Sequence, residues 1–148
     1  MAGSMSEPTL SAPLRLLAGD AEDLAVVAAA LQDAVLRIGD IRYEAKRRRL
    51  TVTVNRYRWE GSQSERVRAA LQLGSVQSVQ ARRLRRGARD AVVELLTVGF
   101  ESGDAPGGLM TFTFAGGGDL RATVECIDAV LADISAPWPT PRIPGHEA

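Results

Sequence analysis

The spacing of apolar residues along the chain changes from a helical to a strand-like period near residue 40. Before that point the apolar residues recur every three or four positions, which places them on one face of a helix; they are Leu24, Val27, Ala28, Leu31 and Val35. Asp20 precedes them as the expected N-cap, and two acids follow in the first turn, where the helix dipole favours them. The pattern predicts an N-terminal helix that ends between residues 31 and 38.

From residue 41 onward apolar and polar residues alternate, as they do in half-buried β-strands. The alternating segments are 41–45, 50–54, 67–73, 76–81, 110–114 and 120–124, and residues 91–102 are apolar on both faces, as in a central strand. Turn-forming residues separate these segments at 46–48, 60–65, 103–108 and 115–119. We therefore expect about seven antiparallel strands in hairpin succession.

The alternation reverses its phase after Val54. Arg56 and Arg58 take the positions of the core face, and Tyr57 and Trp59 take the other face. A bulge near Asn55, or a strand that leaves the sheet edge, is expected to produce this reversal.

The last apolar segment has helical spacing. Ile127, Val130, Leu131 and Ile134 stand at i, i+3, i+4 and i+7, and Pro137 would end the helix. We expect a C-terminal helix here, followed at 139–148 by an extended tail in which Trp138 is the nearest apolar anchor. Residues 1–9 are expected to be a tag remnant and a flexible N-terminus.

Together these elements predict one α+β domain over residues 10–138. We expect a strongly bent antiparallel sheet or partly open barrel, with an N-terminal helix and a C-terminal capping helix. This order of elements resembles the pleckstrin-homology-like barrel in topology alone. At 148 residues and 45% hydrophobic composition, the chain is long enough to bury roughly two-thirds of its unfolded surface.

Charge is unevenly distributed although the formal net charge is zero. Residues 37–89 contain 15 Lys or Arg against four acids, so the remainder of the chain is acidic. This segregation has two interpretations: a positive face for an acidic partner, or basic strands that pair with acidic neighbours across the sheet.

The basic region contains the candidate binding residues. An anion site is expected from the arginines of two clusters, with Arg89 beside the second; the candidates are Arg47, Arg48, Arg49, Arg82, Arg83, Arg85 and Arg86. A stacking platform or groove is expected from Arg56, Tyr57, Arg58 and Trp59, because aromatics interleaved with arginine occur in single-strand binders. The alternative for both sets is a solvated basic surface.

The sequence offers little for catalysis or metal binding. The sole histidine, His146, is in the expected tail, and Cys126 has no CxxC or histidine companion, so we interpret it as core filler. No metal site and no cofactor is expected. A single cysteine favours a reducing, cytoplasmic location, and no apolar run approaches the ~20 residues that span a bilayer, so no membrane association is expected.

Several stretches resemble an uncharacterised bacterial family, domain of unknown function 2948. They are "LQDAV", "GDI", "VNRYRWE", "FAGGG" and "VECIDA", with a "PWPTPR" tail, and the resemblance covers nearly the whole chain. The resemblance implies no activity, cofactor or catalytic residue.

The favoured functional hypothesis is a non-catalytic cytoplasmic module for protein binding or assembly, whose partner is another protein or a second copy in a homodimer. The alternative is binding of RNA or another polyanion through the arginine clusters. The third hypothesis is an enzyme with an unrecognised site.

Overall fold

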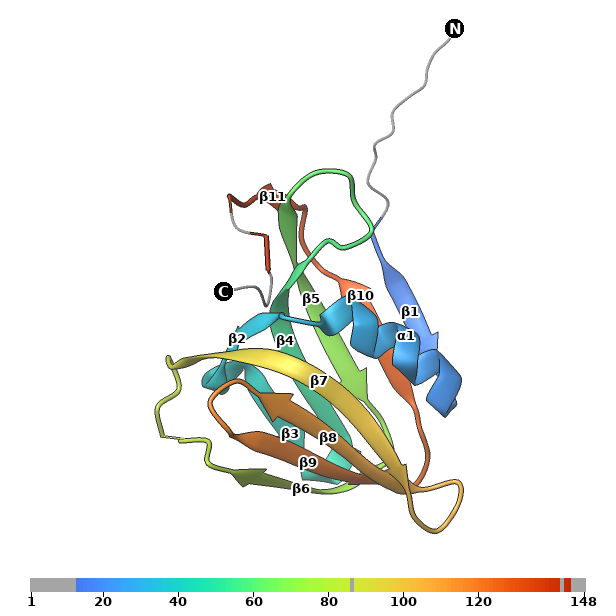
Figure 1. Cartoon of the computed structure of the whole chain (residues 1–148). Helices are drawn as coiled ribbons and strands as arrows, with labels where there is room; N and C mark the ends of the chain where they lie inside the picture. Colours follow the sequence, from blue (N-terminus) through green and yellow to red (C-terminus); the bar gives the residue numbers. More distant parts are fainter. Residues whose placement is uncertain (1–12, 86, 142, 145–148) are drawn as a thin grey trace, which may run out of the picture.

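The computed structural model describes residues 13–85, 87–141 and 143–144 (Figure 1). Within them lie one α-helix, α1 (Ala21–Leu31), and two 3-10 turns, Ile38–Asp40 and Ala45–Arg47. The strands are β1 (Arg15–Ala18), β2 (Val35–Arg37), β3 (Ile41–Glu44), β4 (Arg49–Tyr57), β5 (Glu65–Leu73), β6 (Val76–Arg82), β7 (Val92–Ser102), β8 (Gly108–Phe114), β9 (Asp119–Val124), β10 (Ala129–Asp133) and β11 (Trp138–Pro139). The expected N-terminal remnant 1–9, Arg86 and His146 lie outside the described residues.

The strands form a single bent antiparallel sheet that does not close. Its order is β1-β10-β5-β4-β2-β7-β8-β9-β6, with β3 paired to β4 and β11 paired to β5. The short strand β2 joins two halves of the sheet, because it pairs with β4 on one side and β7 on the other. One half contains β1, β10, β5 and β4, and the other contains β7, β8, β9 and β6. Helix α1 packs against β1 and β7 and covers one opening between the halves (Figure 1). The expected bent antiparallel sheet with an N-terminal helix is confirmed.

The core lies between the two halves of the sheet and beneath α1. Alternate residues of each strand point into it, and the most completely buried include Leu50, Leu71, Phe112 and Leu131. Leu24, Val27 and Leu31 of α1 close this core, as their spacing predicts. The backbone N–H of Asp23 donates to Asp20 Oδ1 at 2.8 Å, so Asp20 is the N-cap, and the helix ends within the expected range.

Residues 129–133 form a strand, so the prediction of a C-terminal helix is wrong. Strand β10 pairs with β1 on one side and with β5 on the other, and these two ladders satisfy its backbone. Ala129 and Leu131 also fit a two-residue period, which puts both in the core. Pairing with two distant strands therefore overrides the local helical spacing, and a pleckstrin-homology-like arrangement with a capping helix is not confirmed.

The expected bulge near Asn55 is also absent. Strand β4 runs unbroken, in continuous register with β5 from Leu50 opposite Leu73 to Tyr57 opposite Arg66. Arg56 keeps its place on the core face and is fully buried, because acidic side chains pair with it there.

After β10 the chain returns to the sheet through β11. Trp138 of β11 pairs with Arg66 of β5. Over the described ranges, no helix has the length and apolar character needed to cross a membrane.

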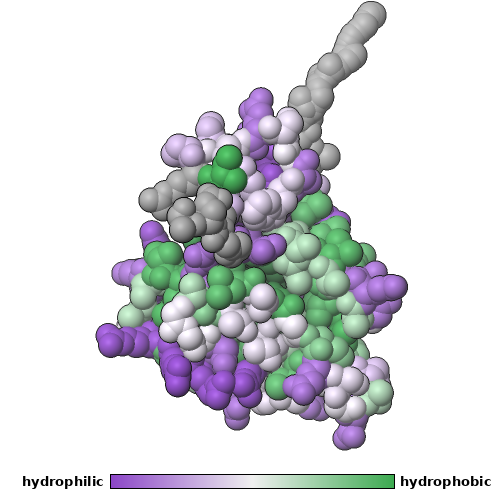
Figure 2. Space-filling model, in the orientation of Figure 1, coloured by the Kyte–Doolittle hydropathy of each residue, from purple (hydrophilic) through white to green (hydrophobic). Residues whose placement is uncertain are grey.

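Figure 2 shows exposed hydrophobic residues over α1 and β1, where Leu17 and Val26 lie, and hydrophilic surface over the β6–β7 connection.

Candidate binding groove at the open seam of the sheet

The sheet leaves a seam between β3 and β6. In the part of the chain that the structure describes, β3 pairs only with β4 and β6 pairs only with β9. The two strands approach each other at one end, where the Tyr43 hydroxyl donates to Gln77 O at 3.1 Å and the N–H of Val76 donates to Arg48 O at 2.9 Å. A side chain and one loop contact, not a strand ladder, therefore connect the two edges.

Away from this end the seam opens into a groove of about 330 Å³. Cavities of ~300–1,000 Å³ commonly hold ligands. The groove is lined by Ile38, Ile41, Tyr43, Val79, Ala81, Leu84, Arg89 and Leu120. The lining comes from β3, β6, β9 and the segments that flank β3 and β6, so distant parts of the sequence meet here.

The inward-facing residues at the seam are less well covered than those of the neighbouring strands. Ile41 and Val79 are only partly buried. Their cross-strand partners, Val52 on β4 and Ala122 on β9, are 2% and 0% exposed. The difference arises because no strand lies between β3 and β6 to complete the apolar layer.

Arg89 contributes the charged part of the groove. The backbone N–H of Gly39 donates to Arg89 O at 2.8 Å, and this bond holds the Arg89 segment beside the start of β3. A Cβ atom at Gly39 would lie 3.2 Å from Arg89 Cβ and 3.5 Å from its guanidinium carbon, so the arginine side chain folds closely over the glycine. No ion pair among the described residues includes Arg89.

The two candidate arginine clusters lie at opposite ends of β6. Residues 47–49 adjoin its start through the bond from Val76 to Arg48, and residues 82–85 follow its end. A strand of this length spans about 20 Å at ~3.3 Å per residue. The described arginines of the two clusters therefore lie at separate places along β6 and do not form one contiguous patch.

Two of the cluster arginines are engaged within the protein. Arg48 Nη2 lies 2.7 Å from Glu125 Oε1, and Arg82 Nη2 lies 2.8 Å from Asp119 Oδ2. The hydrogen bonds from these arginines hold the pKa of Glu125 and of Asp119 below the ordinary values. Part of the basic segment thus pairs with acidic neighbours across the sheet, as one interpretation of the charge pattern predicts. Arg47, Arg49, Arg83 and Arg85 are in no ion pair of the described residues.

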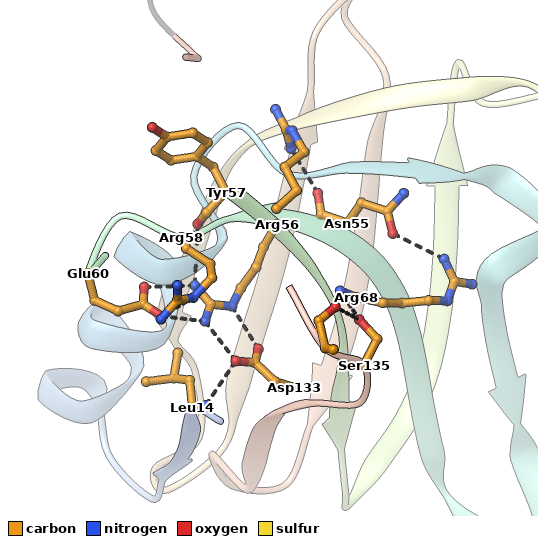
Figure 3. A network of polar contacts seen from close by, with 11 residues as sticks. Leu14, Asn55, Arg56, Tyr57, Arg58, Glu60, Arg68, Asp133 and Ser135 are labelled. Atoms are coloured by element: carbon orange, nitrogen blue, oxygen red, sulfur yellow. Dashed lines mark hydrogen bonds and ion pairs between the residues drawn. The ribbon is translucent and has the colours of Figure 1, made fainter. Parts of the chain in front are cut away.

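Arg56 is the centre of a buried ion network (Figure 3). Its Nε and Nη2 donate to the two carboxylate oxygens of Asp133, each at 2.9 Å. Its Nη1 and Nη2 donate to Glu60 at 3.0 and 2.7 Å, and Nη1 also donates to Tyr57 O at 3.3 Å. These bonds occupy all five guanidinium N–H groups. Arg56 is therefore not available to an external ligand.

The other residues of the expected stacking platform, Tyr57, Arg58 and Trp59, hold the β4–β5 connection in place. Arg58 pairs with Glu65, and Tyr57 is buried against Trp59, with the ring centroids 4.7 Å apart in an edge-on arrangement. The indole Nε1 of Trp59 donates to Gln32 O at 3.2 Å, which ties the β4–β5 connection to the end of α1. Trp59 is 41% exposed, but Tyr57 presents no open ring face beside it.

The sequence pattern predicts the strands that line the groove but not the groove itself. The alternation of Ile41 with Tyr43 and of Val79 with Ala81 marks inward faces, yet nothing in it shows that the two strand edges are unpaired. Arg89 is predicted only as part of an arginine cluster that either binds an anion or forms a solvated basic loop. Cys126 is half-buried in the β9–β10 connection, and no group of His, Cys, Asp or Glu side chains suited to a metal ion occurs within the described ranges.

Comparison with known proteins places the chain in one family. Residues 14–146 match the family model described as protein of unknown function (DUF2948), so the chain belongs to this family. Neither the curated proteins nor the solved structures returned a match.

Proposed function

We propose that this member of the family is a non-catalytic binding module that accepts an extended segment of a partner protein in the groove between β3 and β6. The observation that carries the proposal is the pair of unpaired strand edges on either side of an incompletely covered apolar floor.

An extended polypeptide matches the chemistry of both sides of the groove. A free strand edge offers unpaired N–H and C=O groups, and an added strand can satisfy them. The alternate side chains of such a strand would point inward onto Val79, Ala81 and Ile41, which are partly exposed. A peptide backbone supplies both kinds of contact at once.

The outer face of β6 is polar and gives no comparable surface. Gln77, Ser78, Gln80 and Arg82 are exposed, whereas Val79 and Ala81 between them face the groove. Binding at the seam should therefore depend on alternate residues of one strand. The single cysteine favours a reducing compartment, so we place the module in the cytoplasm.

Site-specific photo-crosslinking in the native host cell tests the proposal. A photoreactive amino acid is placed at Val79, inside the groove, and in a matched variant at Gln80, its outward-facing neighbour. After irradiation and nuclease treatment, mass spectrometry identifies the crosslinked peptides.

The expected result is a crosslink from position 79, and not from position 80, to a defined protein segment with alternating apolar residues. Equal capture from both positions, or crosslinks only to nucleic acid, would overturn the proposal. A segment from the same chain would identify the partner as a second copy.

A further inference from the structure

We infer that the groove selects a partner segment that presents a carboxylate, and that Arg89 binds this carboxylate. The inference rests on the proposed function and specifies the chemistry of the bound segment. Its starting point is the composition of the groove, in which Arg89 is the only charged residue among the described lining residues.

The other described arginines of the same segment, Arg82, Arg83 and Arg85, do not line the groove. Arg82 pairs with Asp119. Arg83 lies beside the β8–β9 turn, where its Nη1 is 3.5 Å from the point that a Cβ atom would occupy if Gly117 had a side chain. Arg85 and Arg89 are both exposed, but Arg85 does not line the groove. Arg89 is therefore distinguished from its cluster by position and not by charge alone.

Arg89 also lies against Gly39, and no ion pair among the described residues includes its side chain. Its backbone is bonded to Gly39, and its side chain lies over that glycine, which has no side chain to displace it. Asp40, the acid next to Gly39, pairs with Arg68 instead. A guanidinium that is positioned and unpaired, beside apolar surface, is suited to bind a carboxylate through two parallel hydrogen bonds.

The location of Arg89 fixes where the carboxylate must lie. Arg89 adjoins Ile38 and Gly39, before β3 begins, whereas the hydroxyl of Tyr43 bridges the opposite end of the seam. An extended segment would thus place apolar side chains along Ile41 and Val79 and its carboxylate at the Arg89 end. The carboxylate can belong to an Asp or Glu side chain or to a C-terminus.

Selection from peptide libraries tests this inference. Random peptides of about eight residues, a length that spans β6 at ~3.3 Å per residue, are displayed in one library with a free C-terminus and in another within a loop. Both libraries are selected on the wild-type protein, on Arg89→Gln and on the matched control Arg85→Gln. Val79→Arg, which fills the groove, identifies peptides that bind elsewhere.

Wild-type protein and Arg85→Gln should enrich an acidic group at one end of an apolar pattern. Arg89→Gln should retain the apolar pattern, lose the acidic preference, and bind the selected peptide about tenfold more weakly, as expected for a lost charged hydrogen bond. Enrichment in the free-terminus library alone would assign the carboxylate to a C-terminus.

The two possible failures are distinguishable. Peptides that depend on Val79 but show no acidic preference would overturn the carboxylate inference and leave the groove intact as a peptide site. Failure to select any peptide whose binding is lost in Val79→Arg would overturn the proposed function as well.

Discussion

Arg56 and Asp133 form a two-bond ion pair across a strand that separates them. Arg56 lies on β4 and Asp133 on β10, with β5 between, and their side chains are 0% and 3% exposed. Asp133 also accepts a hydrogen bond from the N–H of Leu14 at 2.9 Å, so the pair connects β4, β10 and the start of β1. The charged residue that interrupts the apolar pattern of β4 thus has a structural role (Figure 3).

Replacing Asp133 with alanine should lower the free energy of unfolding by about 3–5 kcal/mol, because it leaves a buried guanidinium with one carboxylate instead of two. Urea unfolding of the two proteins measures the difference. Glu101→Ala, at an exposed position of β7, is the control and should change stability by less than about 0.5 kcal/mol.

The combined replacement Arg56→Met and Asp133→Val should recover most of that loss, since apolar residues of similar combined volume commonly replace a buried ion pair at little cost. A double variant as unstable as Asp133→Ala would show that the network contributes more than the pairing of its charges.

Glu60 should make stability depend on acid pH. The hydrogen bond from Arg56 holds the pKa of Glu60 below its ordinary value of 4.5. Because the folded-state pKa is lower than the unfolded-state pKa, the stabilisation is present above about pH 4.5 and is lost as the pH falls through the folded-state value. Glu60→Gln should therefore be less stable than wild type at about pH 7, and the difference between the two proteins should be smaller at about pH 3, measured by denaturant unfolding. A constant difference at both pH values would assign the effect to packing.

Trp59 should stabilise the loop between β4 and β5. Trp59→Phe removes the hydrogen bond to Gln32 O and should cost about 1 kcal/mol in unfolding free energy. Trp138→Phe, in the short edge strand β11, serves as the comparison and should cost less. If single-stranded RNA quenches the Trp59 fluorescence of the Trp138→Phe protein, then the stacking hypothesis holds in place of this structural role.

The sequence predicts those elements whose apolar pattern is determined locally. It does not predict an element whose secondary structure depends on pairing with distant strands. The alternation in 41–54 and 67–81 and the cap at Asp20 predict their strands and helix, because one face of each is buried. The spacing from Ile127 to Ile134 fits a helix and a strand equally well along part of its length, and pairing with β1 and β5 decides between them.

The burial of Arg56 and the presence of the groove could not be predicted from the sequence, for a related reason. Arg56 and Asp133 are 77 positions apart, so nothing near Arg56 indicates its partner. An alternating strand has the same pattern whether its edge is paired or free, so the seam between β3 and β6 emerges only from the full strand order.

Amide hydrogen exchange along β6 tests the open seam most directly. The protein is measured alone and after saturation with a peptide selected on the groove, and residues 77–82 are compared with those of β8, which is paired on both sides. Val76 is left out because its N–H already donates to Arg48 O. An open seam predicts that the β6 amides that point away from β9 exchange rapidly in the free protein and become protected when the peptide binds. Full protection of these amides in the free protein, or no change at saturation, would contradict it.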